Sequence, residues 1–246
     1  MMLHYIKLGY RSALFLVALI FYIINRINRT GSLFGGMEHN HVILSIIWCV
    51  FAVEMLLRFF PSKLESMGCQ KQFARNYKST NATVSEAELL SPAKTALVAE
   101  AWIALNGLIG VLYFLHIIDA GILLLISLAY SVCDMICILF FCPFQTWFMK
   151  NRCCSDCRIY NWDYAMMFTP LVFIPNAYAW SLLGISLLLL LRWEITLRRY
   201  PERFAVNTNA CLACSNCAEK LCHHKKQLRN FWEKNRLREK NKRKIR

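Results

Sequence analysis

The sequence lacks the motifs of the familiar nucleotide-binding and hydrolytic enzymes. It contains no G-x-x-x-x-G-K-[ST] phosphate loop, no G-x-G-x-x-G turn, no G-x-S-x-G elbow and no H-E-x-x-H zinc motif. Nucleotide-driven transport and the usual hydrolase chemistry therefore have no support. Glycine and proline are also scarce, with 9 Gly and 6 Pro in 246 residues. Long loops and low-complexity linkers are therefore not expected.

Hydrophobic residues make up 57% of the chain, and they come in blocks rather than at the spacing of a soluble core. A helix that crosses a bilayer needs about 20 mostly apolar residues. The sequence therefore predicts an all-α, polytopic integral membrane protein, a helical bundle with about six spans. The expected spans are residues 10–27, 41–60, 95–118, 120–142, 159–175 and 177–195.

Basic residues set the expected orientation, because Lys and Arg collect on the cytoplasmic side of a membrane. The loop around Asp119 has no Lys or Arg, whereas 16 of the 29 Lys and Arg lie from Arg192 onward. The loops before residue 95 and after residue 142 are basic as well. We therefore expect a multi-pass protein of the cell membrane with both termini in the cytoplasm.

This orientation requires residues 159–175 to cross the membrane. The segment contains Asn161, Asp163 and Pro170, so the alternative is an interfacial or re-entrant helix. In either case the chain divides into a transmembrane helical domain, residues 1–199, and a cysteine-rich and basic cytoplasmic tail, residues 200–246.

Three acidic residues in the expected spans lie at a similar depth. Glu54, Glu100 and Asp134 are each placed roughly 8–12 Å below the cytoplasmic surface by the helical rise. A charged side chain at the centre of a span costs about 2.5–3.5 kcal/mol and usually marks a pathway or a pair. The pattern predicts a proton relay or an ion site. Alternatively, Glu54 pairs with Arg58 four residues later, whereas Asp134 has no cation nearby in sequence.

Cysteine is abundant, with 12 residues, most of them expected in or beside the cytoplasm. Thiols are kept reduced there, so metal binding or redox chemistry is favoured over a disulfide framework. Two clusters are candidate metal ligands. The first, in the cytoplasmic loop, is Cys153, Cys154 and Cys157, and the second, in the tail, is Cys211, Cys214, Cys217 and Cys222.

The tail cluster resembles the C-x₂-C-x₂-C-x₃-C-P iron–sulfur motif of bacterial ferredoxins. Cys211, Cys214 and Cys217 match the first three positions, while Cys222 follows after a gap of four residues and precedes His223 instead of proline. The resemblance covers residues 211–222. It implies a cluster held by the three matching thiolates, with Cys222 or a cysteine of the loop as the fourth ligand.

Zinc is the alternative metal for the same thiols. Cys154 and Cys157 with Cys211 and Cys214 would form a tetrahedral site, and Cys217 with Cys222 and a following histidine would form a second.

The leading functional hypothesis is a membrane redox protein. Its iron–sulfur cluster would pass electrons from a cytoplasmic donor to a membrane acceptor such as quinone, with the buried carboxyl groups handling protons. One alternative is a zinc-stabilised interaction or assembly module without catalysis. The other is a transporter or metal sensor that uses the buried carboxyl groups.

The basic tail carries Leu228, Phe231 and Trp232 at the spacing of one helix face. Such a helix suits contact with anionic lipids of the inner leaflet. No base-reading motif accompanies the charge, so specific nucleic acid binding is not expected.

Overall fold

A computed structural model describes residues 2–27, 41–62, 65–80, 92–151, 153–217, 220–223 and 225–226 of the chain. Within these ranges the protein is helical and forms no strand. The single extended pairing there is an antiparallel bridge between Ser79 and Asn209. The all-α class predicted from the hydrophobic blocks is therefore confirmed.

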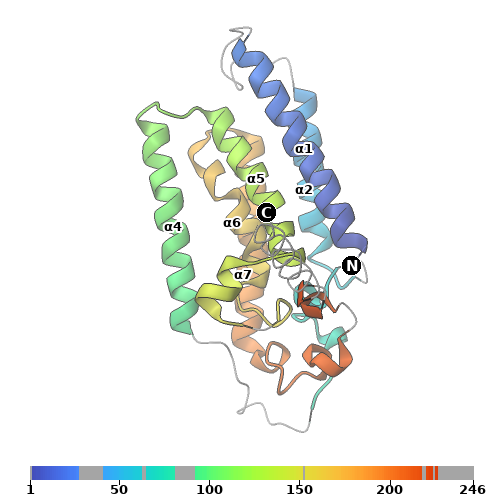
Figure 1. Cartoon of the computed structure of the whole chain (residues 1–246). Helices are drawn as coiled ribbons and strands as arrows, with labels where there is room; N and C mark the ends of the chain where they lie inside the picture. The colour runs from blue at the N-terminus through green and yellow to red at the C-terminus, as the bar shows by residue number, and fades with distance from the viewer. Residues whose placement is uncertain are drawn as a thin grey trace, which may run out of the picture.

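Long helices form the bundle seen in Figure 1. They are α1 (Met2–Ile27), α2 (His41–Leu57), α4 (Pro92–Phe114), α5 (Ala120–Leu139) and α7 (Ala177–Arg199). In the described part of the chain, 4 helices (α1, α4, α5 and α7) are long and apolar enough to cross a membrane, while α2 is apolar but has 17 residues. Helix α1 packs against α5, and α2 packs against α7.

Local sequence explains where the two central helices begin. The Asp119 side chain accepts a hydrogen bond from the Ile122 amide at 2.9 Å and caps α5. Asn176 caps α7 in the same way through the Tyr178 amide at 2.8 Å. Short polar side chains at these positions satisfy amide groups that a helix start leaves without partners.

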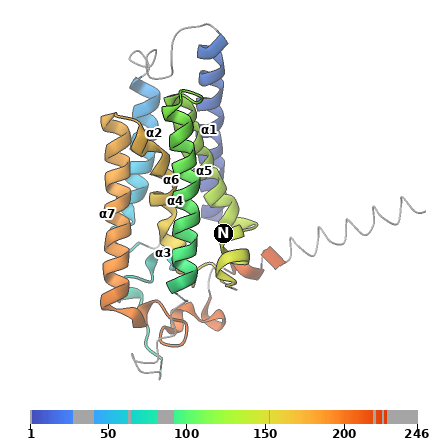
Figure 2. The same ribbon diagram turned by 90° about the vertical axis from the view of Figure 1, so that its left-hand side faces the viewer.

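Residues 159–175 do not form the single continuous helix expected of the span that the charge distribution requires. They form η5 (Tyr160–Trp162), α6 (Asp163–Phe168) and η6 (Thr169–Phe173). Asn161 has non-helical backbone angles (φ −100°, ψ 16°), and Pro170 lies at the start of η6. The neighbouring helices shield these short pieces from the surroundings. A broken helix within a membrane needs such shielding because its backbone polar groups are not all paired. The segment still rises through the bundle to the end where α7 begins (Figure 2).

Gly110 lets the outlying helix α4 approach this broken segment. Helix α4 contacts the bundle through η4 (Phe144–Met149) and η6. The space that a Cβ atom would occupy at Gly110 is filled by the ring of Phe173. A larger residue at position 110 would push α4 away from η6.

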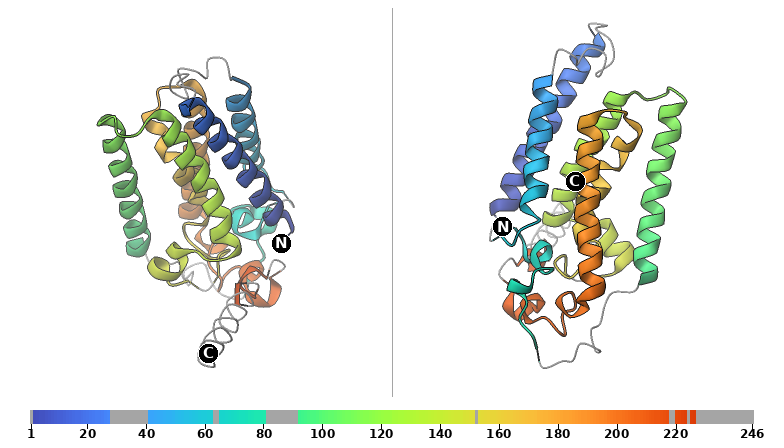
Figure 3. Two further views of the ribbon diagram at one scale, coloured as in Figure 1. Left: turned by 45° about the horizontal axis from the view of Figure 1, so that its top comes forward. Right: turned by 180° about the vertical axis from the view of Figure 1, so that it is seen from behind.

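One end of the bundle, which we call the cysteine end, collects most of the connecting structure. The start of α1, the ends of α2, α5 and α7 and the start of α4 all lie there (Figures 1 and 3). The same end carries α3 (Met67–Gln70), η2 (Ala74–Asn76), η7 (Pro201–Arg203), η8 (Ala210–Leu212) and η9 (Cys214–Asn216). The segments that the distribution of Lys and Arg predicts on one side of the membrane therefore lie together in the fold.

Candidate functional site

Arg11 lies at the centre of a buried ionic network near the cysteine end. Its side chain is 0% exposed. One guanidinium nitrogen donates to Glu54 Oε2 at 2.8 Å and to the Tyr164 hydroxyl at 3.3 Å. The other donates to Asp134 Oδ2 at 3.1 Å. Helices α1, α2, α5 and α6 are thus joined through one cation, which compensates the cost of burying the two carboxylates.

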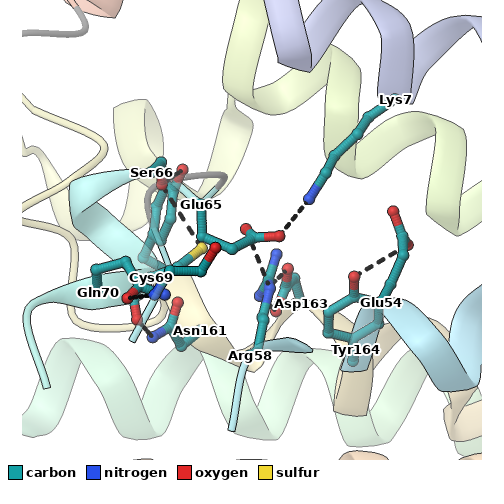
Figure 4. Close-up of polar contacts among 12 residues, drawn as sticks. Lys7, Glu54, Arg58, Glu65, Ser66, Cys69, Gln70, Asn161, Asp163 and Tyr164 are labelled. Atoms are coloured by element: carbon teal, nitrogen blue, oxygen red, sulfur yellow. Dashed lines mark hydrogen bonds and ion pairs between the residues drawn. The ribbon is translucent and has the colours of Figure 1, made fainter. Parts of the chain in front are cut away.

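Arg58, just beyond α2, continues the network toward the loops. It forms ion pairs with Asp163 at 2.7 Å and with Glu65 at 3.6 Å, and Lys7 pairs with Glu65 at 2.6 Å (Figure 4). Burial alone would raise the pKa of the Glu65 carboxyl, but Arg58 and Lys7 outweigh burial and lower it. Glu65 is therefore an anion that holds both cations in place.

The network has an excess of acidic groups. Three cations (Lys7, Arg11 and Arg58) face four carboxyl groups (Glu54, Glu65, Asp134 and Asp163). In addition, Glu54 Oε1 is buried and has no hydrogen-bond partner among the described groups. One proton added at Glu54 or Asp134 would balance these charges.

The structure brings together two of the three predicted intramembrane carboxyl groups. Glu54 and Asp134 share Arg11, whereas Glu100 is exposed on α4. Arg58 turns to Asp163 rather than to Glu54 four residues before it. The sequence did not identify Arg11 as the cation of this network. A basic residue before an apolar block is usually interpreted as a determinant of membrane orientation.

A cavity of about 260 Å³, which we call the apolar pocket, lies beside the network. Its wall includes the aromatic side chains of Trp102 on α4, Tyr130 on α5 and Phe144 on η4. Asp134 and Asp163 also line it. The pocket therefore combines an apolar surface with two carboxyl groups that belong to the ionic network.

Five thiols line the apolar pocket, and they differ in acidity. Burial raises the pKa of Cys154, whose Sγ lies 2.9 Å from both Gln145 Oε1 and Lys225 Nζ. Burial also raises the pKa of Cys157 to about 11. The other three are Cys133 and Cys137 on α5 and Cys142 beyond its end.

Cys142 is the acidic thiol of this group. The pKa of Cys142 is lowered to about 7 by a hydrogen bond from the Cys137 thiol, by one from the backbone amide of Gln145 and by the charge of Lys225. These effects outweigh burial, which alone would raise the pKa. The Gln145 amide donates to the Cys142 sulfur at 3.4 Å. Cys142 is therefore the thiol of this pocket that most readily forms the nucleophilic thiolate near neutral pH.

Alkylation should report this acidity. We expect the rate of iodoacetamide modification at Cys142 to be half-maximal near pH 7 and to reach its plateau about one pH unit higher. In the variant Cys137→Ala the midpoint should move upward, because the hydrogen bond to the thiolate is lost. Peptide mapping by mass spectrometry measures both profiles. A wild-type midpoint near pH 9 would contradict the assignment.

A second cavity of about 310 Å³, the tail cavity, is lined by sulfur and imidazole groups. Lys220, also on its wall, adopts a positive φ of 51° and donates its amide to Cys217 Sγ at 3.4 Å. Amide donors of this kind stabilise thiolates. The candidate ligands on the wall are Cys153, Cys214, Cys217, Cys222 and His223.

The two cavities group the predicted cysteine ligands differently from the two clusters seen in the sequence. Cys153 joins three tail cysteines, while Cys154 and Cys157 line the apolar pocket instead. Cys211 lies in η8 and does not line either cavity. Among the described residues, no three Cys, His, Asp or Glu side chains are arranged to hold one metal ion.

Lys71 fixes the loop that separates the two cavities. Its ammonium group is buried and donates to the carbonyl oxygens of Ser155 at 2.8 Å and Cys157 at 3.3 Å. It also lies 5.2 Å from the ring centre of Trp193. Burial lowers the pKa of Lys71 to about 8. The loop conformation therefore depends on a cation from a distant part of the chain.

The predicted lipid-binding helix of the basic tail falls outside the described residues. Comparison of the chain with protein-family models, with curated proteins and with solved structures finds no match. The arguments for function therefore rest on the two cavities and the ionic network.

Proposed function

We propose that the protein is a membrane redox protein with a thiolate-held iron–sulfur centre at the tail cavity and an electron acceptor in the apolar pocket. One observation carries the proposal: Cys153 lines the tail cavity and Cys154, the next residue, lines the apolar pocket. A single peptide bond thus connects the two sulfur-lined walls. Electrons entering at the tail would have a short path to the acceptor.

The tail cavity brings four cysteine side chains to one wall, the ligand number that a cubane iron–sulfur cluster needs. A zinc ion would use the same thiols, each about 2.3 Å from the metal. Ligands of an iron–sulfur cluster attach to different irons and stand farther apart. Cys153, Cys214, Cys217 and Cys222 supply the four thiolates for this role, and the centre would accept and release electrons there.

The ionic network supports coupled proton transfer. Asp134 belongs both to the wall of the apolar pocket and to the network around Arg11. Because one added proton would balance the charges of the network, Asp134 would supply a proton when the acceptor is reduced. Glu54, which shares Arg11 with it, would exchange that proton with the loops.

The topology in this proposal has six passes, with the cysteine end in the cytoplasm. Support comes from the basic residues that gather at this end and from the rise of the broken segment 159–175 through the bundle. The centre would then face a cytoplasmic donor, and the basic tail would lie on anionic lipids. Cysteine labelling in intact and permeabilised cells tests this orientation.

Anaerobic purification with visible and EPR spectroscopy and iron and sulfide analysis tests the centre. We expect a coloured protein that loses its iron in the variant Cys217→Ser. The matched control Cys49→Ser, on the exposed face of α2, should keep it. Cys211→Ser should also keep most of it, because Cys211 lies outside the tail cavity, although the ferredoxin resemblance would make it a ligand.

A colourless protein with stoichiometric zinc would overturn the redox assignment. It would instead favour the zinc-stabilised assembly module. In that case Cys217→Ser should reduce protein abundance, while Asp134→Asn should leave it unchanged.

A further inference from the structure

Two thiols of the apolar pocket are paired with each other. Cys137 lies in the last turn of α5, which ends at Leu139, and Cys142 lies three residues beyond that end. Both side chains line the apolar pocket from positions five residues apart, and the Cys137 thiol donates a hydrogen bond to the Cys142 sulfur. Disulfide formation would bring the two sulfur atoms to about 2.05 Å.

We propose that Cys137 and Cys142 form a redox-active dithiol that passes two electrons to a quinone-class acceptor bound in the apolar pocket. Both S–H bonds break, one S–S bond forms, and the quinone gains two electrons and two protons to become a hydroquinone. Return to the dithiol takes two electrons and two protons. This return step rests on the proposed function, because its electrons come from the tail centre.

The pocket wall suits a planar ring with polar edges. The rings of Trp102 and Tyr130 lie 4.7 Å apart, and those of Trp102 and Phe144 lie 6.1 Å apart, which forms a continuous aromatic surface. Aromatic ligands stack favourably on such surfaces. Asp134 on the same wall can donate a hydrogen bond to a quinone oxygen when it carries a proton, because an ionised carboxylate has no hydrogen to donate.

The remaining thiols of the pocket are less suited to this role. Cys154 is held by Gln145 and Lys225, and the pKa of Cys157 is raised to about 11. A thiol attacks best when its pKa lies near the ambient pH, which Cys142 satisfies. Cys137, its hydrogen-bond partner, is then the thiol that completes the disulfide.

The test uses the full chain, purified in detergent and reduced, with a short-chain ubiquinone analogue as the probe. We expect equimolar hydroquinone, read by ultraviolet absorbance, together with a Cys137–Cys142 disulfide mapped by mass spectrometry. Both signals should fall to background in Cys137→Ser and in Cys142→Ala. The control Cys49→Ser changes an exposed thiol on α2, outside the apolar pocket, and should leave both signals unchanged.

Metal analysis of the same samples separates this inference from the proposed function. The dithiol should react with the quinone analogue whether the tail cavity holds iron or zinc. Monodisperse elution of Cys137→Ser and Cys142→Ala shows that the two variants fold. Hydroquinone formation that persists in them, or a disulfide between other cysteines, overturns the proposal. So does a wild-type protein that stays reduced.

Discussion

Replacing Arg11 with leucine is expected to lower the free energy of unfolding by about 3–5 kcal/mol, the usual cost of removing one partner from a buried ion pair. The guanidinium group is fully buried and bonds to Glu54, Asp134 and Tyr164. Leucine would leave both carboxyl groups buried without a cation. Equilibrium unfolding in mixed micelles measures the change.

The control for Arg11 is Arg26→Leu, on the same helix but exposed at its opposite end. This variant should change the free energy of unfolding by less than about 0.5 kcal/mol. A triple variant, Arg11→Leu with Glu54→Gln and Asp134→Asn, should recover part of the lost stability, because no net charge then remains buried at this site. Equal stabilities of Arg11→Leu and Arg26→Leu would refute the role given to Arg11.

The second large effect is expected at Trp193. Its side chain is 1% exposed and packs edge-to-face on Phe204, with ring centres 4.8 Å apart. Trp193→Ala should lower the free energy of unfolding by about 3–5 kcal/mol, because it removes the buried ring and leaves a cavity. It should also free Phe204 and the residues after α7. Because the ammonium group of Lys71 rests on the same ring and binds the Cys157 carbonyl, Cys157 should react faster with maleimides.

Trp180 offers the matched control, since it lies on the same helix and is 58% exposed. Trp180→Ala should shift the free energy of unfolding by less than about 1 kcal/mol. Limited proteolysis should cut the chain after residue 200 faster in Trp193→Ala than in Trp180→Ala. Identical cleavage in the two variants would show that Trp193 does not anchor this segment.

The long apolar helices could be predicted because a membrane span is a local property of about 20 residues. The broken segment 159–175 is less apolar, Asn161 and Pro170 interrupt it, and its neighbours bury it. Hydropathy alone does not separate a lipid-facing helix from a buried broken one. Asn161 and Pro170 were the signals in the sequence that the helix is interrupted.

The buried network and the cavities depend on contacts that a sequence window does not contain. Arg11 and Asp134 are separated by 123 positions in the chain, so Asp134 has no evident cation nearby in sequence. Cys153 and Cys154 are adjacent, yet they line different cavities. Spacing could identify the cysteines as a group. Which wall each one lines depends on contacts of the folded loop, among them those of Lys71 with Ser155 and Cys157 and that of Cys154 with Gln145.

The contacts of Lys71 also imply an order of events during biosynthesis. Lys71 emerges from the ribosome early, its carbonyl partners at Ser155 and Cys157 follow, and Trp193, against which its ammonium group rests, comes last. The full set of contacts around the loop that carries Cys153 can therefore form only after α7 has been synthesised. The proposed centre of the tail cavity would then be assembled after translation.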